Sequence, residues 1–127
     1  MKNINTNNTI EFGDIFYAEL KGEGSVQTGI RPVIIAQNNI GNRFSRTVEV
    51  IPCTTKIEKA AYMPTHVQLP ANDITGLRRD SVALAEQTST INSCQLIRKL
   101  GHLDNDQLQR VGSARQIQSP FFGKFAS

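Results

Sequence analysis

Short apolar runs separated by turn-forming residues constrain the fold of this chain most strongly. The longest runs contain four or five residues, and Gly, Pro, Asn or Asp stands beside most of them. Runs of this length fit β-strands and fall far below the roughly 20 residues of a membrane-spanning helix. Because they recur across only 127 residues, we expect a single small domain of antiparallel strands, either a barrel or a sandwich.

The segment Gly-Ile-Arg-Pro-Val-Ile-Ile-Ala, residues 29–36, gives the clearest strand. A proline is tolerated where a strand begins, because the missing N–H can fall at the first position. We therefore expect a buried strand from about Pro32 to Gln37. This places Arg31 at the mouth of a rigid element, where it is either a solvated strand cap or a group held ready for an anion.

Similar patterns predict the remaining elements. We expect strands at 15–20, 47–55, 66–69 and 81–91, a short helical turn at 92–97, and a last strand at 98–103. Asp104 is a suitable N-cap, and Gln107 three residues later completes a capping box. A helix should follow from Asn105 to about Gln118, with a thin buried face made by Leu108, Val111, the stem of Arg115 and one side of Gln118.

We expect one domain at 11–118 between two tails. Residues 1–10 are polar and rich in Asn, which predicts a flexible N-terminal tail. Residues 119–127 form a C-terminal tail with three of the six phenylalanines, which we expect to pack on the domain or on a partner chain. A formal charge of +3 and a pI of about 9.1 favour polyanions only mildly.

The cysteines and histidines predict neither a metal site nor a cofactor. Cys53 and Cys94 lie far apart, and no ligand spacing joins them to His66 or His102. We expect two free thiols and two structural histidines. The first residues lack the apolar core of a signal peptide, so we expect a cytoplasmic location and no membrane partner.

Polar groups at strand ends are the remaining candidates for chemistry. These are Arg31, Thr54 with Thr55, and Glu86 with Gln87. RNA cleavage without a metal needs a proton acceptor, a proton donor and groups that stabilise charge on phosphorus. Arginine offers a fork of donors that matches phosphate. Each residue alone is more simply a strand-end residue, and spacing does not show that the set converges.

Several motifs, taken in order, resemble a known family. They are the GD opening, the RPV strand, the QN-x-x-GN-x-F-S-x-T loop, the PTHV segment and the RDSV-x-x-x-EQ strand. Over roughly residues 11–118 the chain resembles the MazF/PemK (Kid) toxins of type II toxin–antitoxin systems, in particular the branch found in Gram-positive bacteria. The resemblance implies an SH3-like antiparallel barrel with a C-terminal helix, acting as a homodimer.

The resemblance also implies a sequence-specific, metal-independent endoribonuclease that cuts single-stranded mRNA. The products would be a 2′,3′-cyclic phosphate and a 5′ hydroxyl. It assigns catalysis to Arg31 and to Thr54, with Thr55 one alignment slip away. Glu86 becomes the candidate general base, and Gln87 helps to hold RNA.

The loop at 21–29 matches the family's mobile loop, which covers the active site and contacts bases. Its polar residues Glu23, Ser25 and Gln27 are therefore candidate substrate contacts. Base stacking should fall on an aromatic residue, and the candidates are Phe16, Tyr17, Phe44 and Tyr62. The partners implied are a cognate antitoxin with an acidic C-terminal segment and, for the toxin–antitoxin complex, operator DNA.

Two rival functions share this fold. A CcdB-like toxin would poison DNA gyrase without cleaving RNA, although such toxins lack the pair formed by Arg31 and Thr54. A barrel that only binds nucleic acid or protein is the other rival, because a resemblance carries fold more securely than function.

Overall fold

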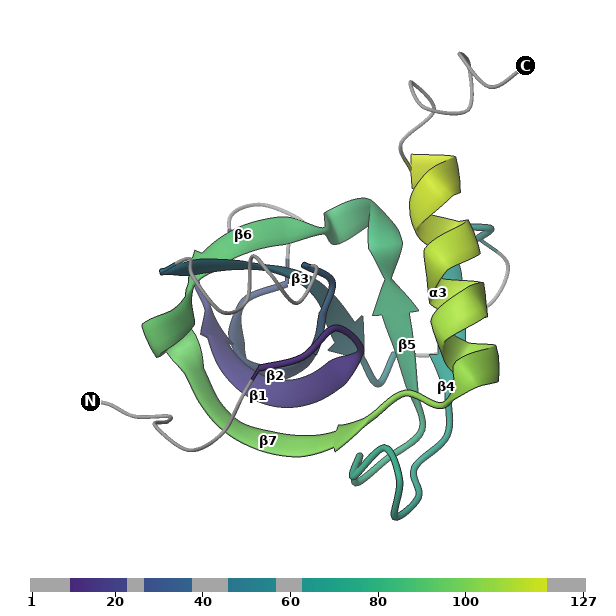
Figure 1. The fold of residues 1–127 in the computed structure, drawn as a ribbon, viewed down its shortest axis with the longest axis horizontal. Helices are drawn as coiled ribbons and strands as arrows, with labels where there is room; N and C mark the ends of the chain where they lie inside the picture. The colour runs from purple at the N-terminus through teal and green to yellow at the C-terminus, as the bar shows by residue number, and fades with distance from the viewer. Residues whose placement is uncertain (1–9, 23–26, 38–45, 57–62, 119–127) are drawn as a thin grey trace.

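A computed structural model describes residues 10–22, 27–37, 46–56 and 63–118 (Figure 1). The predictions made for the two tails and for Glu23, Ser25, Phe44 and Tyr62 lie outside these residues. No helix within the described segments is long and apolar enough to cross a membrane.

Seven antiparallel strands and one helix make up the described fold. In chain order they are β1 (Asp14–Leu20), β2 (Gly29–Ile35), β3 (Thr47–Thr54), β4 (His66–Leu69), β5 (Ser81–Leu84), the 3-10 turn η1 (Ala85–Gln87), β6 (Ser89–Asn92), the 3-10 turn η2 (Ser93–Gln95), β7 (Leu96–His102) and α3 (Asn105–Gln118). The prediction of a mainly β domain with a C-terminal helix is confirmed.

The sheet curls strongly but its hydrogen-bonded ladder is not closed. The strand order is β4-β5-β3-β2-β1-β7, and β6 pairs with β3 beside this path. In Figure 1 the strands wrap around a central space, while α3 lies beside β4 and β5. Among the described residues, β6 and β7 are joined only through η2 and share no ladder. At this point the two strands are connected by the chain itself and not by hydrogen bonds between strands.

The strand predicted at 81–91 is wrong as a single element. It divides into β5 and β6, and η1 lies between them. The Thr88 hydroxyl and its N–H both donate to the carbonyl of Ala85, at 2.6 and 3.2 Å, and these bonds hold the turn. Because of the turn, β5 pairs with the end of β3 while β6 pairs with its beginning.

Two smaller boundaries also differ from the prediction. Strand β2 begins at Gly29, so Pro32 lies inside it and pairs with Tyr17 on β1. The ladder between β2 and β3 starts only at Val33. The ladder therefore does not need a backbone N–H from Pro32, which proline lacks. Strand β7 begins at Leu96, so the helical turn expected at 92–97 is shortened to the three residues of η2.

The apolar run of β2 is buried on both of its faces. Val33 and Ile35 belong to a cluster inside the curled sheet, which we call the barrel core. Ile34 belongs to a second cluster between the sheet and α3, which we call the helix core and which also holds Ile51 and Val111. Alternation along a strand sends successive side chains to opposite faces. A run without polar residues is therefore what this position requires.

The predicted start of α3 is confirmed in detail. The Asp104 side chain accepts from the Gln107 N–H, and the Gln107 side chain accepts from the Asp104 N–H, both at 2.8 Å. This is the reciprocal capping box. Val111 is buried, and Leu108 and Arg115 are partly buried, as expected. The side chain of Gln118 lies outside the described part of the chain.

Removing this cap should weaken the fold measurably. Asp104→Ala is expected to lower the free energy of unfolding by about 1 kcal/mol, because the N–H of Gln107 loses its acceptor. Thermal unfolding should then shift down by about 3–6 °C. The control is Asp106→Ala, which removes an exposed ion pair with Arg110 (3.1 Å), expected to contribute only about 0.3–0.5 kcal/mol. An equal or larger loss in the control would contradict the capping role.

Candidate active site

Arg31 lies on β2, and Thr54 is the last residue of the neighbouring strand β3. The ladder between β2 and β3 pairs Val33 with Pro52. Extended two residues beyond this last pair, the same antiparallel register places Arg31 opposite Thr54. Arg31 shares the face of Val33, which belongs to the barrel core. Both candidate residues are therefore expected at one end of that core.

The guanidinium of Arg31 is held from one side. Its Nε donates to the carbonyl of Thr28 at 2.7 Å, in the residues that lead into β2. Within the described segments, no hydrogen bond or ion pair engages its two terminal amino groups. The side chain is only partly exposed. The arginine is thus oriented while its terminal donors are available to an anion.

Thr54 and Thr55 differ in burial and in contacts. Thr54 is 5% exposed, and its Oγ1 accepts from the N–H of Lys56 at 3.2 Å. A hydroxyl that accepts one hydrogen bond still has its own proton to donate. Thr55 follows the strand and is exposed. Of the two hydroxyls, that of Thr54 is the one fixed beside the end of β2.

Gln87 forms a hydrogen bond to Gln27, near the C-terminal end of the loop at 21–29. Its side-chain oxygen accepts from the N–H of Gln27 at 2.9 Å. The two residues also line a cavity of about 250 Å³ between the end of β1 and the beginning of β6, together with Lys21 and Gln95. The structure therefore brings together two of the predicted substrate contacts, in a hollow lined by both polar and apolar residues.

Glu86 makes its contacts at the beginning of β4. One carboxylate oxygen accepts from the Thr65 hydroxyl at 2.9 Å, and the other lies 2.7 Å from Nε2 of His66 on β4. The turn η1 sends the side chains of Glu86 and Gln87 to different neighbours. In the described segments no contact joins Glu86 to Arg31 or Thr54. To serve as a general base, the carboxylate would have to exchange its present partners.

The contact between His66 and Glu86 was not predicted. The two residues are 20 positions apart, and strand periodicity carries no signal for a pair that depends on a 3-10 turn. The structural role expected for His66 agrees with this pairing and with its side-chain exposure of 9%.

The proposed stacking role of Phe16 is wrong. Phe16 is 1% exposed and lies within the barrel core. Alternation along β1 turns its ring inward with Ala18, whereas Tyr17 faces the other way. The Tyr17 ring is already covered by Arg98, whose guanidinium carbon lies 5.3 Å from the ring centroid.

Both cysteines are free, as expected. Cys53 is fully buried, and burial raises the pKa of its thiol to about 12, so the group stays neutral at physiological pH. In the parts of the chain that the structure describes, no cluster of three or more His, Cys, Asp or Glu side chains could hold a metal ion. Metal-independent chemistry remains a prediction.

Comparison with known proteins agrees on a single family. The family model of the PemK-like, MazF-like toxins of type II toxin–antitoxin systems matches residues 11–118. Endoribonuclease EndoA of Bacillus subtilis (strain 168) is 45% identical over 109 residues, which cover 85% of this chain and 92% of that protein.

Solved structures show the same fold. The Mycobacterium tuberculosis toxin MazF-mt6 aligns with a TM-score of 0.70 at 27% identity, covering 84% of this chain and 95% of that one. A mycobacterial endoribonuclease in complex with its cognate antitoxin aligns with a TM-score of 0.71 at 22% identity, covering 87% and 94%. At that identity the second likeness concerns the fold alone.

Fold and site together define a small curled β protein with an arginine and a threonine on adjoining strand ends. The chain belongs to the PemK-like, MazF-like toxins of type II toxin–antitoxin systems.

Proposed function

We propose that this protein is an endoribonuclease toxin that cleaves single-stranded mRNA at a short sequence without a metal ion. The observation that carries the proposal is the register of β2 and β3, which pairs Val33 with Pro52 and, if continued by two residues, would set Arg31 opposite Thr54. Family membership and 45% identity to an endoribonuclease support it. Because this relative is an endoribonuclease, a gyrase poison and an inactive barrel are less favoured functions.

Cleavage would proceed by attack of a ribose 2′ oxygen on the adjacent phosphorus. The bond from phosphorus to the 5′ oxygen breaks, and this oxygen takes up a proton from solvent water, which leaves a 2′,3′-cyclic phosphate and a 5′ hydroxyl. In this proposal, the free terminal donors of Arg31 bind the scissile phosphate and neutralise the added charge. The Thr54 hydroxyl donates to the same developing charge.

We propose Glu86 as the proton acceptor of this reaction. Glu86 is the candidate from the family resemblance, but its carboxylate now contacts Thr65 and His66. In our proposal, RNA binding releases it from these partners. Glu86→Gln tests this role, because an amide keeps the shape of the side chain but cannot take up a proton at neutral pH.

The cavity beside Gln87 is the proposed place for a base. Its volume of about 250 Å³ exceeds the roughly 150 Å³ that is enough to hold a benzene ring. Gln87 and Gln27 offer amide groups of the kind that read base edges in single-stranded RNA. Glu23 and Ser25, from the same loop, remain proposed contacts.

The proposed partners follow from family membership and charge. A cognate antitoxin would cover the RNA surface with an acidic segment, since the chain carries a net charge of +3. A homodimer, binding of operator DNA by the toxin–antitoxin complex, and a cytoplasmic location are further proposals.

A direct experiment tests the function. The protein is incubated with a long single-stranded RNA in EDTA, and the 5′ ends of the products are mapped by sequencing. We expect cuts that recur at one short sequence. Intact RNA, or cuts without a shared sequence, would refute a sequence-specific and metal-independent nuclease.

A pair of variants decides which threonine takes part. Thr54→Val keeps the shape of the side chain but removes its hydroxyl, so we expect the cleavage rate to fall by about 100-fold. Thr55→Val changes an exposed residue beyond the strand, and we expect a rate within about threefold of the wild type. Rates are compared in EDTA under single-turnover conditions. The reverse order of effects would assign the role to Thr55.

A further inference from the structure

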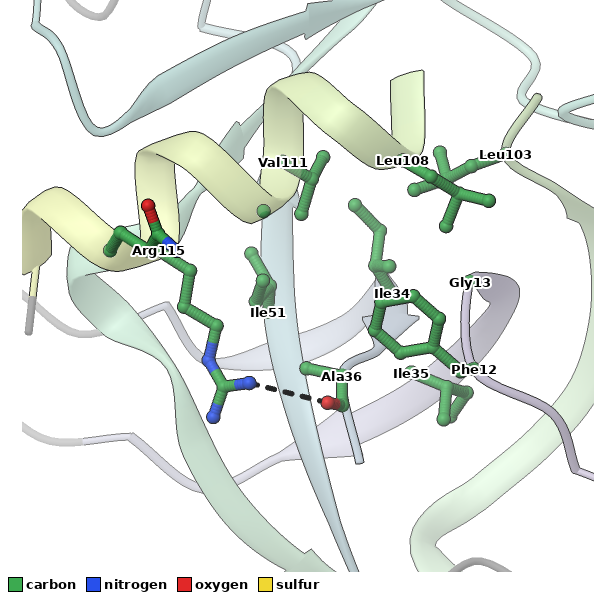
Figure 2. A pocket seen from close by; sticks show the side chains of 12 residues that line it. Phe12, Gly13, Ile34, Ile35, Ala36, Ile51, Leu103, Leu108, Val111 and Arg115 are labelled. Carbon is green, nitrogen blue, oxygen red and sulfur yellow. Dashed lines mark hydrogen bonds between the residues drawn. The ribbon is translucent and has the colours of Figure 1, made fainter. Parts of the chain in front are cut away.

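An apolar groove lies between α3 and the strands β2 and β3. It has a volume of about 240 Å³ (Figure 2). Leu108 and Val111 of α3 face Ile34 and Ile51 of the sheet across it. Phe12 lies at its edge and is 46% exposed, which is a large apolar surface for a side chain next to a core.

Polar groups close one end of this groove. Arg115 crosses from α3 to the sheet and donates to the carbonyl of Ala36 at 3.3 Å (Figure 2). It also pairs with Glu49. The groove is therefore apolar along its length and has a polar rim near the C-terminal end of α3.

The groove lies away from the candidate active site. It opens onto Ile34, which belongs to the helix core, whereas Arg31 shares the face of Val33 in the barrel core. RNA held at Arg31 and Thr54 would not fill it. A dry cavity of about 150 Å³ lined by such side chains can take up a benzene ring, so this groove is large enough for one phenylalanine ring.

The segment at 119–127 has the chemistry and the position to supply that ring. It contains Phe121, Phe122 and Phe125 within nine residues, and it follows α3 directly. Gln116, two residues before the end of α3, lines the groove. The segment also lies beyond the residues that match the family model.

Chain length allows the segment to turn back along the helix. Leu108 and Gln116 are eight residues apart, or about 12 Å along α3 at the usual helical rise. Nine extended residues reach about 30 Å. Pro120 disfavours helical backbone at the residue before it, which favours a change of direction there.

We propose that residues 119–127 fold back along α3 and place a phenylalanine ring in this groove of the same chain. A tethered segment acts at an effective concentration that reaches the millimolar range for short linkers. This tethering favours the segment over a second copy of the chain or a separate protein partner. The inference is independent of RNA cleavage.

Nuclear magnetic resonance of the full chain tests the inference directly. With methyl groups labelled, we expect nuclear Overhauser contacts from tail phenylalanine rings to the methyl groups of Ile51 and Val111. A sample that mixes labelled and unlabelled chains separates contacts within one chain from contacts between chains. Contacts found only between chains would overturn the proposal, and so would a groove without any tail contact.

Matched variants separate filling of the groove from general damage. A Cβ added at Gly112, which lines the groove, meets no atom within 4 Å. Gly112→Leu should therefore fill the space and abolish the contacts, while Gly112→Ala should keep them. Replacing Phe121, Phe122 and Phe125 together by Ser should abolish the contacts and shift the Ile51 methyl resonance, because the aromatic ring beside it is lost. Persistence of the contacts in Gly112→Leu would also contradict docking at this site.

Discussion

Replacing Arg31 by Ala is expected to slow RNA cleavage by a factor of about 100 to 1,000. Within the described residues, the side chain has terminal donors without a hydrogen-bond partner at the end of β2 next to β3. Its loss leaves the charge that develops on phosphorus without a positive partner. Single-turnover cleavage of a mapped RNA in EDTA measures the effect.

A matched arginine shows whether the loss is specific to this position. Arg98 lies on the exposed side of β7, against the ring of Tyr17, and has no place in the proposed chemistry. We expect Arg98→Ala to keep the rate within about threefold of the wild type. Circular dichroism should show that both variants are folded, since Arg31 is not part of either core. Wild-type cleavage by Arg31→Ala would remove the residue from the mechanism.

The largest effect on stability is expected at Gly76. Its φ of +69° lies in the left-handed region, and a Cβ added there would fall 1.9 Å from the carbonyl oxygen of Leu100. The left-handed backbone alone costs about 1–2 kcal/mol for other residues. The clash is with the backbone of β7 and cannot be relieved by a side-chain rotation. We therefore expect Gly76→Ala to lose about 3 kcal/mol or more of unfolding free energy.

Thermal and urea unfolding of Gly76→Ala measure this loss, and Gly112→Ala is its control. An alanine at Gly112 meets open space inside a helix. It should stabilise the protein by about 0.5–1 kcal/mol, the usual advantage of alanine over glycine. Equal stability of the two variants would contradict the close packing of the Gly76 turn on β7.

Local sequence patterns account for most of the fold. The strand at 66–69 and the helix at 105–118 have the predicted bounds, because turn residues and a capping box mark their ends. The turn η1 has no such mark. The apolar run Ser-Val-Ala-Leu-Ala continues into it, and the bend lets β5 and β6 pair with opposite ends of β3.

The candidate site was harder to predict than the fold. The relation of Arg31 to Thr54 follows from the register of β2 and β3, which neither strand encodes alone. The contact of Glu86 with His66 depends on η1, which the sequence pattern did not reveal. For Phe16, the aromatic residue was recognised but its face was not, because Phe16 and Tyr17 are equally plausible inward residues until β1 is paired.

The end groups of the RNA products test the central proposal most directly. Wild-type protein is given a mapped single-stranded RNA in EDTA, and each fragment is analysed for its terminal phosphate by mass spectrometry. Cleavage through Arg31 and Thr54 predicts a 2′,3′-cyclic phosphate on one fragment and a 5′ hydroxyl on the other. Fragments with a 5′ phosphate and a 3′ hydroxyl, or cleavage that requires added metal, would contradict it.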